Sequence, residues 1–430
     1  MSGFSEPRKA EAAFKFNGKN VTKQLKPYLK SVAYTDVASG DSDQLDLNLQ
    51  NIGAEWLGKW YPTKGDKVVG SLIFYNWTKA GTEKTLPLGV FTMDDISFTG
   101  GPMSAKFGCV AVPNSESFRV RERTKTWENI TVQGIAKEIA SRYKLDLRYS
   151  GESITIKSLE QSDQTDCAFL YKVCEDYGLS MKVYAGAIVI YSQTEMEKKK
   201  SVATLNRQSF VDDNWTFNDT LAGIYTGARI SYKSSSSDEE ISVYLGLKAE
   251  NASGSRVLKI SETADSLNDA YYKAAARVNK SNQEATTISG KIFPNPKICA
   301  GVCVTISGMG KANGKYFVDK SKLEIGESGT SQDIEMHKCQ KRLKHTPAPA
   351  AQKSSGSGGS HKVGDIVNFH GGKHYVSSYS GAKGYNAKAG PAKITLGPDC
   401  KGNGKAHPWH LIHTDKTSNV YGWVDEGTFD

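Results

Sequence analysis

Residues 44–50 read QLDLNLQ, and this stretch decides the class of fold for the first part of the chain. Leu45, Leu47 and Leu49 alternate with polar residues, which is the period-two pattern of a strand with one buried face. Similar stretches follow at 68–77, 88–98 and 105–112, and the turn signals GD, AGT and TGGP separate them. We therefore expect an antiparallel barrel or sandwich up to about residue 119.

The period changes between about residues 127 and 192. Apolar residues at every fourth position predict an amphipathic helix capped by Thr131: Ile135, Ile139 and Tyr143. A second helix is expected from about Asp166 to Tyr177, with Asp166 suited to cap it and Gly178 just after its end. The stretch MKVYAGAIVIYS then reads as a hairpin, so this region is expected to be a small α/β insertion.

Strand patterns return from about residue 201 to 344, interrupted by one helix at 266–279. Two β-rich units therefore flank the insertion, and they are candidates for related copies, although no direct sequence repeat joins them. The stretch TPAPAAQKSSGSGGS has nothing to bury and reads as a flexible tether. The predicted domains are 1–118, 119–200 and 201–345, followed by a linker at 346–360 and a module at 361–430.

Composition excludes several classes of protein. The formal net charge is +9 over 430 residues, and basic residues are interspersed with acidic ones, which argues against dedicated nucleic-acid binding. No stretch approaches the apolar length of a membrane span, and the N-terminus lacks the apolar core of a signal peptide, so we expect synthesis in the cytoplasm without Sec export. The seven cysteines lack CxxC spacing, which argues against a disulfide scaffold and a zinc ribbon.

Five segments, taken in order, resemble the late control D family, the baseplate hub proteins of contractile phage tails. The resemblance spans roughly residues 10–340. The segments are YPTKGDKV, LGVFTMDDISFTGGP, TWENITVQGIAKEIA, LEQSDQTDCAFLYKVCEDYGL and PNPKICAGVCVTISGMGKANGKYFV.

This resemblance implies a mainly β fold with two tube-like β-barrel domains and a small α/β domain between them. It implies a homotrimer whose six barrels form a ring, joining a hexameric tail tube to a trimeric spike among other baseplate proteins. The chain is then a structural part of a virion or of a tailocin-like contractile injection system, with no catalytic residues, metal or cofactor. The residues leave open whether the particle is a phage or a bacteriocin-like tail.

Residues 361–430 resemble bacterial SH3-like domains of phage tail and cell-wall proteins, chiefly through HPWHLIH and VYGWV. A small SH3-like barrel is therefore expected there. Aromatic faces pack on sugar rings and imidazole can donate or accept a hydrogen bond, so protein or cell-wall contact is expected at four residues: Tyr379, Trp409, His410 and Trp423. The alternative is that these rings fill a small core.

Two chemical alternatives centre on the same module. His407, His410 and His413, with Cys400 nearby, suggest zinc, but residues three apart in a strand point to opposite faces. Cys400 also suggests a Cys/His cell-wall peptidase. Its glycine-rich loop GPDCKGNGKAH has no following helix to stabilise a thiolate, so the sequence favours a non-enzymatic module.

Overall fold

The protein is described by a computed structural model at residues 7–77, 79–101, 103–111, 116–184, 186–233, 240–262, 264, 266–327, 329–345 and 361–429. The chain forms two compact units, residues 1–348 and 349–430, which are treated separately. The linker expected at 346–360 lies outside the described residues. Within the described ranges, no helix has the combined length and apolar character that crossing a bilayer requires.

The first β unit curls around one apolar core, to which every long strand contributes. Leu45, Leu47 and Leu49 are fully buried there, so the predicted half-buried strand at 44–50 is confirmed. The elements are β1 (Lys9–Phe16), β2 (Lys19–Asn20), α1 (Thr22–Leu25), β3 (Leu29–Val37), β4 (Gln44–Gln50), β5 (Lys67–Tyr75), β6 (Glu83–Thr99) and β7 (Ser104–Val110).

The insertion packs two helices against short sheets, as the sequence predicts. Thr131 caps the first helix, since its side-chain oxygen accepts a hydrogen bond from the Gly134 amide at 3.0 Å. Its elements are α2 (Glu116–Arg119), β8 (Glu122–Thr131), α3 (Val132–Arg142), β9 (Asp146–Ser150), β10 (Thr155–Thr165), α4 (Asp166–Asp176), β11 (Leu179–Tyr184), β12 (Ala187–Ser192) and α5 (Gln193–Lys198).

The prediction that Asp166 caps the second helix was wrong. The cap of α4 is Thr165, which accepts from the Ala168 amide. Asp166 is fully buried, and its carboxylate lies 2.5 Å from the Arg142 guanidinium and 2.6 Å from the Tyr143 hydroxyl. Burying a carboxylate is costly unless it is paired and hydrogen-bonded, so Asp166 points inward to these partners instead of capping the helix.

The second β unit follows, with a smaller sheet and a long helix inserted into it. The observed helix α6 is capped by Ser266 and is four residues longer at its end than the predicted 266–279. The elements are β13 (Ala203–Leu205), η1 (Arg207–Ser209), β14 (Phe210–Asp219), β15 (Gly227–Lys233), β16 (Glu240–Gly246), β17 (Val257–Ser261), α6 (Leu267–Gln283), β18 (Thr286–Ile292), β19 (Cys303–Ile306), η2 (Gly310–Ala312), β20 (Gly314–Gly326) and β21 (Gly329–Lys338).

The two β units have the same strand order. The first runs β3-β4-β7-β6-β5-β1, and the second runs β14-β18-β21-β20-β19-β13. Numbered along the chain within each unit, setting aside the two-residue β2 and the separate sheet of β15, β16 and β17, both orders are second, third, sixth, fifth, fourth, first. Neighbours are antiparallel throughout, except that β13 pairs with β19 in parallel.

Local details match as well. Gly65 and Gly301 precede the fourth strand of their units, with φ of 92° and 87° that favour glycine. Each donates its amide at 2.8 Å to the fifth strand, Gly65 to the Met93 carbonyl and Gly301 to the Val318 carbonyl. The fifth strand then bulges, after Met93 in β6 and after Val318 in β20. Met93 and Val318 therefore occupy equivalent positions in a duplicated fold.

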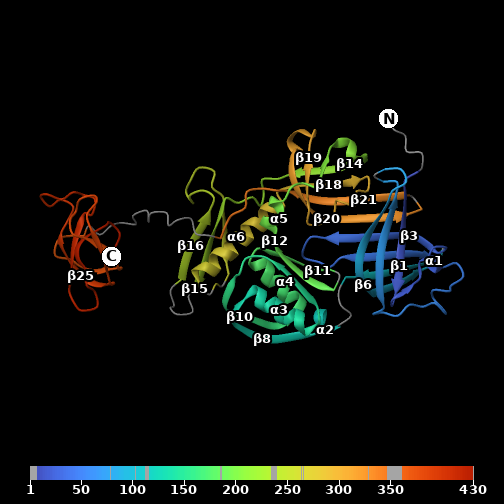
Figure 1. The fold of residues 1–430 in the computed structure, drawn as a ribbon, viewed down its shortest axis with the longest axis horizontal. Coiled ribbons are helices and arrows are strands. Elements are labelled where there is room, and N and C mark those ends of the chain that lie inside the picture. Colours follow the sequence, from blue (N-terminus) through green and yellow to red (C-terminus); the bar gives the residue numbers. More distant parts are fainter. Residues whose placement is uncertain are drawn as a thin grey trace. The chain divides into compact units, whose positions relative to one another are not determined.

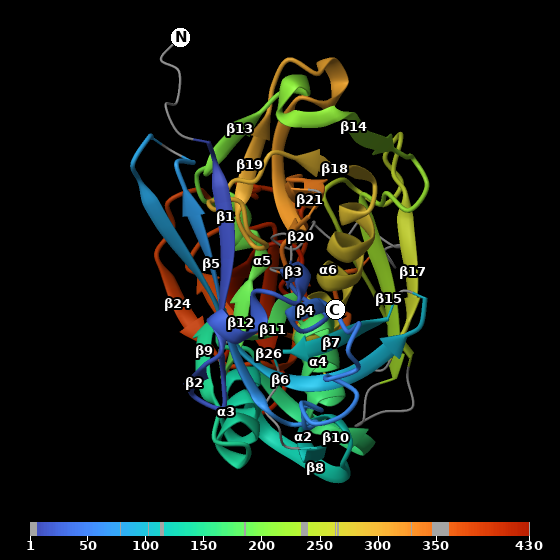
Figure 2. The same ribbon diagram turned by 90° about the vertical axis from the view of Figure 1, so that its right-hand side faces the viewer.

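One 13-stranded sheet joins the two units, because β20 pairs with β3 as well as with β21 (Figures 1 and 2). Within the described residues, hydrogen bonds close neither unit into a barrel. The units are therefore curled sheets here, and the tube-like barrels expected from the resemblance stay a prediction.

The C-terminal unit is a six-stranded sheet in the order β22-β25-β26-β27-β23-β24, built on its own apolar core. Its strands are β22 (Ile366–Phe369), β23 (Gly372–Tyr375), β24 (Gly384–Ala387), β25 (Gly390–Leu396), β26 (Trp409–His413) and β27 (Tyr421–Val424). A separate core explains why this segment forms its own compact unit. The SH3-like assignment stays a prediction.

Candidate assembly interface

The junction between the two β units, which we call the filled junction, is a strand pairing. Residues 320–326 of β20 run antiparallel to residues 31–37 of β3. Leu323 lies directly opposite Tyr34, both side chains are buried, and both belong to the core of the first unit. The fifth strand of one unit thus completes the core of the other, beside that unit's second strand.

A buried ion cluster holds the insertion at this junction. The Lys182 ammonium of β11 lies 2.6 Å from the Asp36 carboxylate and 3.0 Å from the Asp43 carboxylate. Burial raises the pKa of Asp43 to about 6, although Lys182 opposes the rise. Asp36 also accepts the Ala300 amide at 2.9 Å, so one carboxylate contacts the insertion and the second unit.

A second buried cluster fixes α5 to the second unit. The His337 ring bridges Glu197 at 2.9 Å and Asp319 at 2.8 Å, and Arg342 pairs with Glu197 as well. Burial alone would lower the pKa of His337, but hydrogen bonds to Asp319 and Glu197 raise it to about 9. The charged side chains of this cluster hold α5 against the second unit, and the positive charge on His337 is paired with two carboxylates.

In the described part of the chain, two strand edges have no partner strand of the kind that β20 and β3 give each other at the filled junction. Beyond Met93, β6 pairs only with β7, and β14 pairs only with β18, among the described residues. Counting from the matched bulges, Phe98 of β6 corresponds to Leu323, and Phe217 of β14 corresponds to Tyr34. Both phenylalanines are only half-buried, whereas their counterparts are buried.

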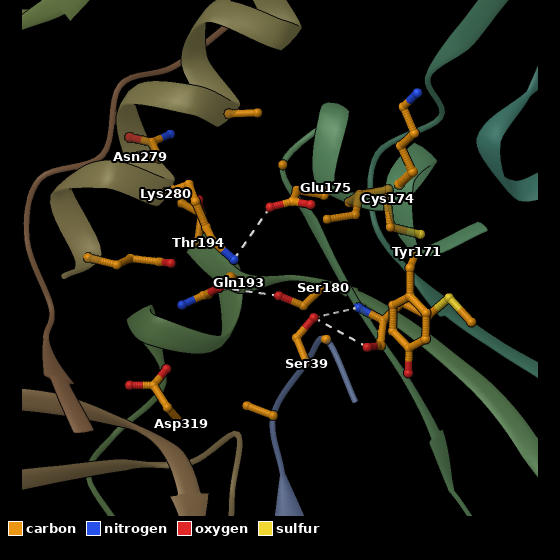
Figure 3. A pocket seen from close by; sticks show the side chains of 18 of the residues that line it. Ser39, Tyr171, Cys174, Glu175, Ser180, Gln193, Thr194, Asn279, Lys280 and Asp319 are labelled. Atoms are coloured by element: carbon orange, nitrogen blue, oxygen red, sulfur yellow. Dashed lines mark hydrogen bonds and ion pairs between the residues drawn. The ribbon is translucent and has the colours of Figure 1, made fainter. Parts of the chain in front are cut away.

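A cavity of about 490 Å³ lies where the insertion, the second unit and residues 38–40 of the first unit meet (Figure 3). Figure 3 shows Lys280 of α6 reaching Glu175 of α4, with 3.5 Å between the charged atoms. Ser39 hydrogen bonds to the Met181 backbone, and burial raises the pKa of Cys174 far above its usual value. A thiol held protonated in this way is a poor nucleophile, so the cavity reads as a packing gap between elements.

The four residues singled out in the C-terminal module do not form one site. Trp409 is buried in the core and donates to Glu426 at 3.0 Å, so it is inaccessible as a platform. His410 and Trp423 lie opposite each other on β26 and β27, with ring centroids 5.3 Å apart. Tyr379 is exposed, and among the described residues no ring contact joins it to that pair.

The sequence analysis did not single out Tyr421, although its exposed ring lies 5.9 Å from the His410 ring. Alternation along VYGWV could have found it, because Tyr421 and Trp423 share one face of the strand. The accessible face therefore comprises His410, Tyr421 and Trp423. Thr395 contacts His410 Nδ1 at 2.6 Å and fixes the orientation of the ring.

The remaining histidines of HPWHLIH have separate partners. His407 pairs with Asp425 and stacks on Tyr375, whereas His413 contacts the Asp415 carbonyl. Among the described residues, no three His, Cys, Asp or Glu side chains are grouped as metal ligands. Cys400 lies in a turn, and no histidine contacts its sulfur within that same set.

No family model matches the chain. Over 217 residues it is 24% identical to the probable baseplate hub proteins of Escherichia phages 186 and P2, which covers 49% of this chain and 53% of each relative. The chain thus matches over about half the length of these curated relatives.

Solved structures of tail proteins show a similar fold. The 43 kDa tail protein of prophage MuSo2 from Shewanella oneidensis gives a TM-score of 0.56, and the tail protein from Neisseria meningitidis MC58 gives 0.57. Both are 11% identical and cover 76% of this chain, with 98% and 96% of their own lengths. Over about three quarters of its length the chain therefore shares the fold of these tail proteins, and over about half it resembles baseplate hub proteins in sequence.

Proposed function

We propose that the chain is a non-enzymatic hub subunit in the baseplate of a contractile phage tail or tailocin-like particle. Three copies form a closed ring that joins a hexameric tail tube to a trimeric spike and contacts other baseplate proteins. The observation that carries this proposal is the duplicated strand order, with one filled junction and two open edges.

The geometry supports a ring for a simple reason. If the edge of β14 in one copy pairs with the edge of β6 in the next, every junction repeats the pairing of β3 with β20. Such a contact is head-to-tail, and it generates a ring when the rotation closes. Three copies with two units each then give the sixfold arrangement that a hexameric tube requires.

The C-terminal unit adds a contact module for a protein or the bacterial cell wall. Its His410, Tyr421 and Trp423 face offers two aromatic rings and an imidazole, a combination suited to sugar rings or extended peptides. Tyr379 is a separate exposed candidate. The second candidate function, a hub-associated peptidase or peptidoglycan-binding adaptor, is favoured only by this face and by Cys400.

The test is the mass of the purified chain in solution, measured by light scattering. We expect three times the 46.9 kDa of one chain. A monomer at micromolar concentration, or a heterogeneous filament, would contradict the ring. Incubation with purified peptidoglycan should cause no loss of turbidity, and a loss that disappears in Cys400→Ser would favour the peptidase.

A further inference from the structure

The loop that follows the third strand differs between the two units, and we call residues 51–64 of the first unit the aromatic loop. Its counterpart in the second unit is the shorter segment 294–300, since Leu49 matches Ile292 and Gly65 matches Gly301. At the filled junction this short loop contacts the neighbouring unit, because the Ala300 amide donates to Asp36 of β3.

Among the described residues, no hydrogen bond joins the aromatic loop to the second unit, and the loop exposes several large apolar side chains. Ile52 is 78% exposed, Leu57 51% and Tyr61 52%, beside a packed cluster formed by Trp56, Trp60 and Tyr28. Grouped exposure of large apolar side chains is typical of an interaction surface. In addition, Asn51 Nδ2 and Trp56 Nε1 are buried without an acceptor among the described residues.

The loop lies at the open edge of β6. The Tyr61 ring stacks on Phe98, with centroids 5.9 Å apart and planes 29° from parallel. Phe98 holds the position that Leu323 has at the filled junction. A strand laid along this edge would therefore lie beside Tyr61 as well as beside Phe98.

Two charged residues indicate that the partner of this edge is a second copy of the chain. Matching the two units places Lys64 at the position of Ala300, and Asp219 of β14 at the position of Asp36. Lys64 and Asp219 are both exposed, and neither is in an ion pair among the described residues, although Asp219 accepts a hydrogen bond from the Thr286 hydroxyl at 2.8 Å. At the filled junction the Ala300 amide contacts Asp36. The equivalent contact between two copies would place Lys64 beside Asp219.

Apolar surface on the other side agrees with this pairing. Leu221, which follows β14, is 73% exposed, and its counterpart Ala38 is buried at the filled junction. Trp215 and Phe217 on β14 are half-buried. Both open surfaces therefore carry apolar residues at positions that are covered where a neighbour is present.

We propose that the aromatic loop of one copy clasps β14 of the next copy, with Lys64 paired to Asp219 and Tyr61 packed beside Phe217. This inference rests on the proposed ring and specifies its interface. The insertion supplies Lys182 at the filled junction. The longer loop, with its own lysine and aromatic rings, supplies the corresponding contact between copies.

The test is a charge exchange in the full chain. Lys64→Glu and Asp219→Lys should each weaken assembly by about a hundredfold, because each places like charges together at the interface. The double variant should restore most of the loss. Lys157→Glu on β10 is the matched control, since it makes the same charge change at an exposed lysine of the insertion, outside the aromatic loop and β14, and should assemble as wild type.

The dissociation constant of the oligomer, measured by analytical ultracentrifugation, distinguishes the outcomes, and circular dichroism checks folding. A wild-type chain that is monomeric would overturn the ring itself. A wild-type trimer that both single variants form equally well would overturn only the clasp. Single variants that weaken the trimer without rescue in the double variant would overturn the pairing of Lys64 with Asp219.

Discussion

At the scale of single residues, His337 shows how the chain uses buried charge. Its ring bonds to Asp319 on the neighbouring β20 and to Glu197 on α5, so one side chain connects the second unit to the insertion. Hydrogen bonds from His337 and Arg342 outweigh the effect of burial and lower the pKa of Glu197 to about 2. Removing one member of such a group leaves the others buried and unpaired.

His337→Gln should therefore destabilise the fold in a pH-dependent way. The folded pKa of His337 is about 9 and its ordinary value is 6.5, so its contribution is complete below pH 6.5 and is lost as pH rises through 9. We expect the free energy of unfolding to fall by about 3 kcal/mol at pH 6. The deficit should shrink above pH 9, as measured by urea unfolding.

The control for this prediction is Glu195→Gln on the same helix. Glu195 is exposed, and within the described part of the chain its one ion pair is with exposed Lys198, so its loss should change stability by less than about 0.5 kcal/mol. A deficit in His337→Gln that stays constant from pH 6 to pH 10 would show that His337 acts through packing rather than charge.

At the scale of elements, the edge of β6 beyond Met93 and the edge of β14 are the surfaces that matter. An exposed strand edge can pair with another chain. Among the described residues these two edges have no partner strand, whereas the equivalent edges of β20 and β3 pair with each other. Figure 1 shows β14 and the first unit on opposite sides of the β20–β3 junction. One copy therefore offers two different edges, as head-to-tail association requires.

Cysteines placed at matched edge positions should cross-link neighbouring copies. Ser97 corresponds to Lys322 and Asn218 to Thr35, which lie opposite each other at the filled junction. Opposite residues in antiparallel strands have Cα atoms about 4.5–5.5 Å apart, within disulfide range. The Ser97→Cys, Asn218→Cys double variant should run as a covalent trimer on a non-reducing gel, with no larger species.

Either single variant should stay monomeric on the same gel. Bands that continue beyond the trimer would indicate an open filament, and an uncross-linked double variant under oxidising conditions would show that these edges do not meet in this register.

The local elements of the fold were predictable from the sequence, whereas the residue-by-residue equivalence of the two units was not. Alternation at 44–50 and the Thr131 cap are local signals, and both were predicted correctly. The two β units were expected to be related copies and their common strand order agrees, but no direct repeat could show it, because equivalent residues such as Phe98 and Leu323 share only apolar character. Their equivalence depends on strand pairing between distant segments, which a single sequence does not display.

At the scale of the whole molecule, we expect the duplicated units and the C-terminal unit to have separate roles. Each has its own core, and the division into compact units falls between residues 348 and 349. The open edges and the aromatic loop all belong to the first compact unit, so ring formation should not require the C-terminal module. Target contact should require it.

A chain ending at His345 should therefore form the same trimer as the full chain, because it keeps β6, β14 and the aromatic loop. Light scattering should give three times the mass of the shortened chain. The isolated module, residues 361–430, should bind the natural target, tested by pull-down with purified cell walls and, separately, with spike and baseplate proteins. Tyr421→Ala should weaken that binding, whereas Lys416→Ala, an exposed change away from the ring contacts, serves as its control. A shortened chain that stays monomeric while the full chain trimerises would move assembly to the C-terminal module, since no change at the β6 and β14 edges would then explain the loss.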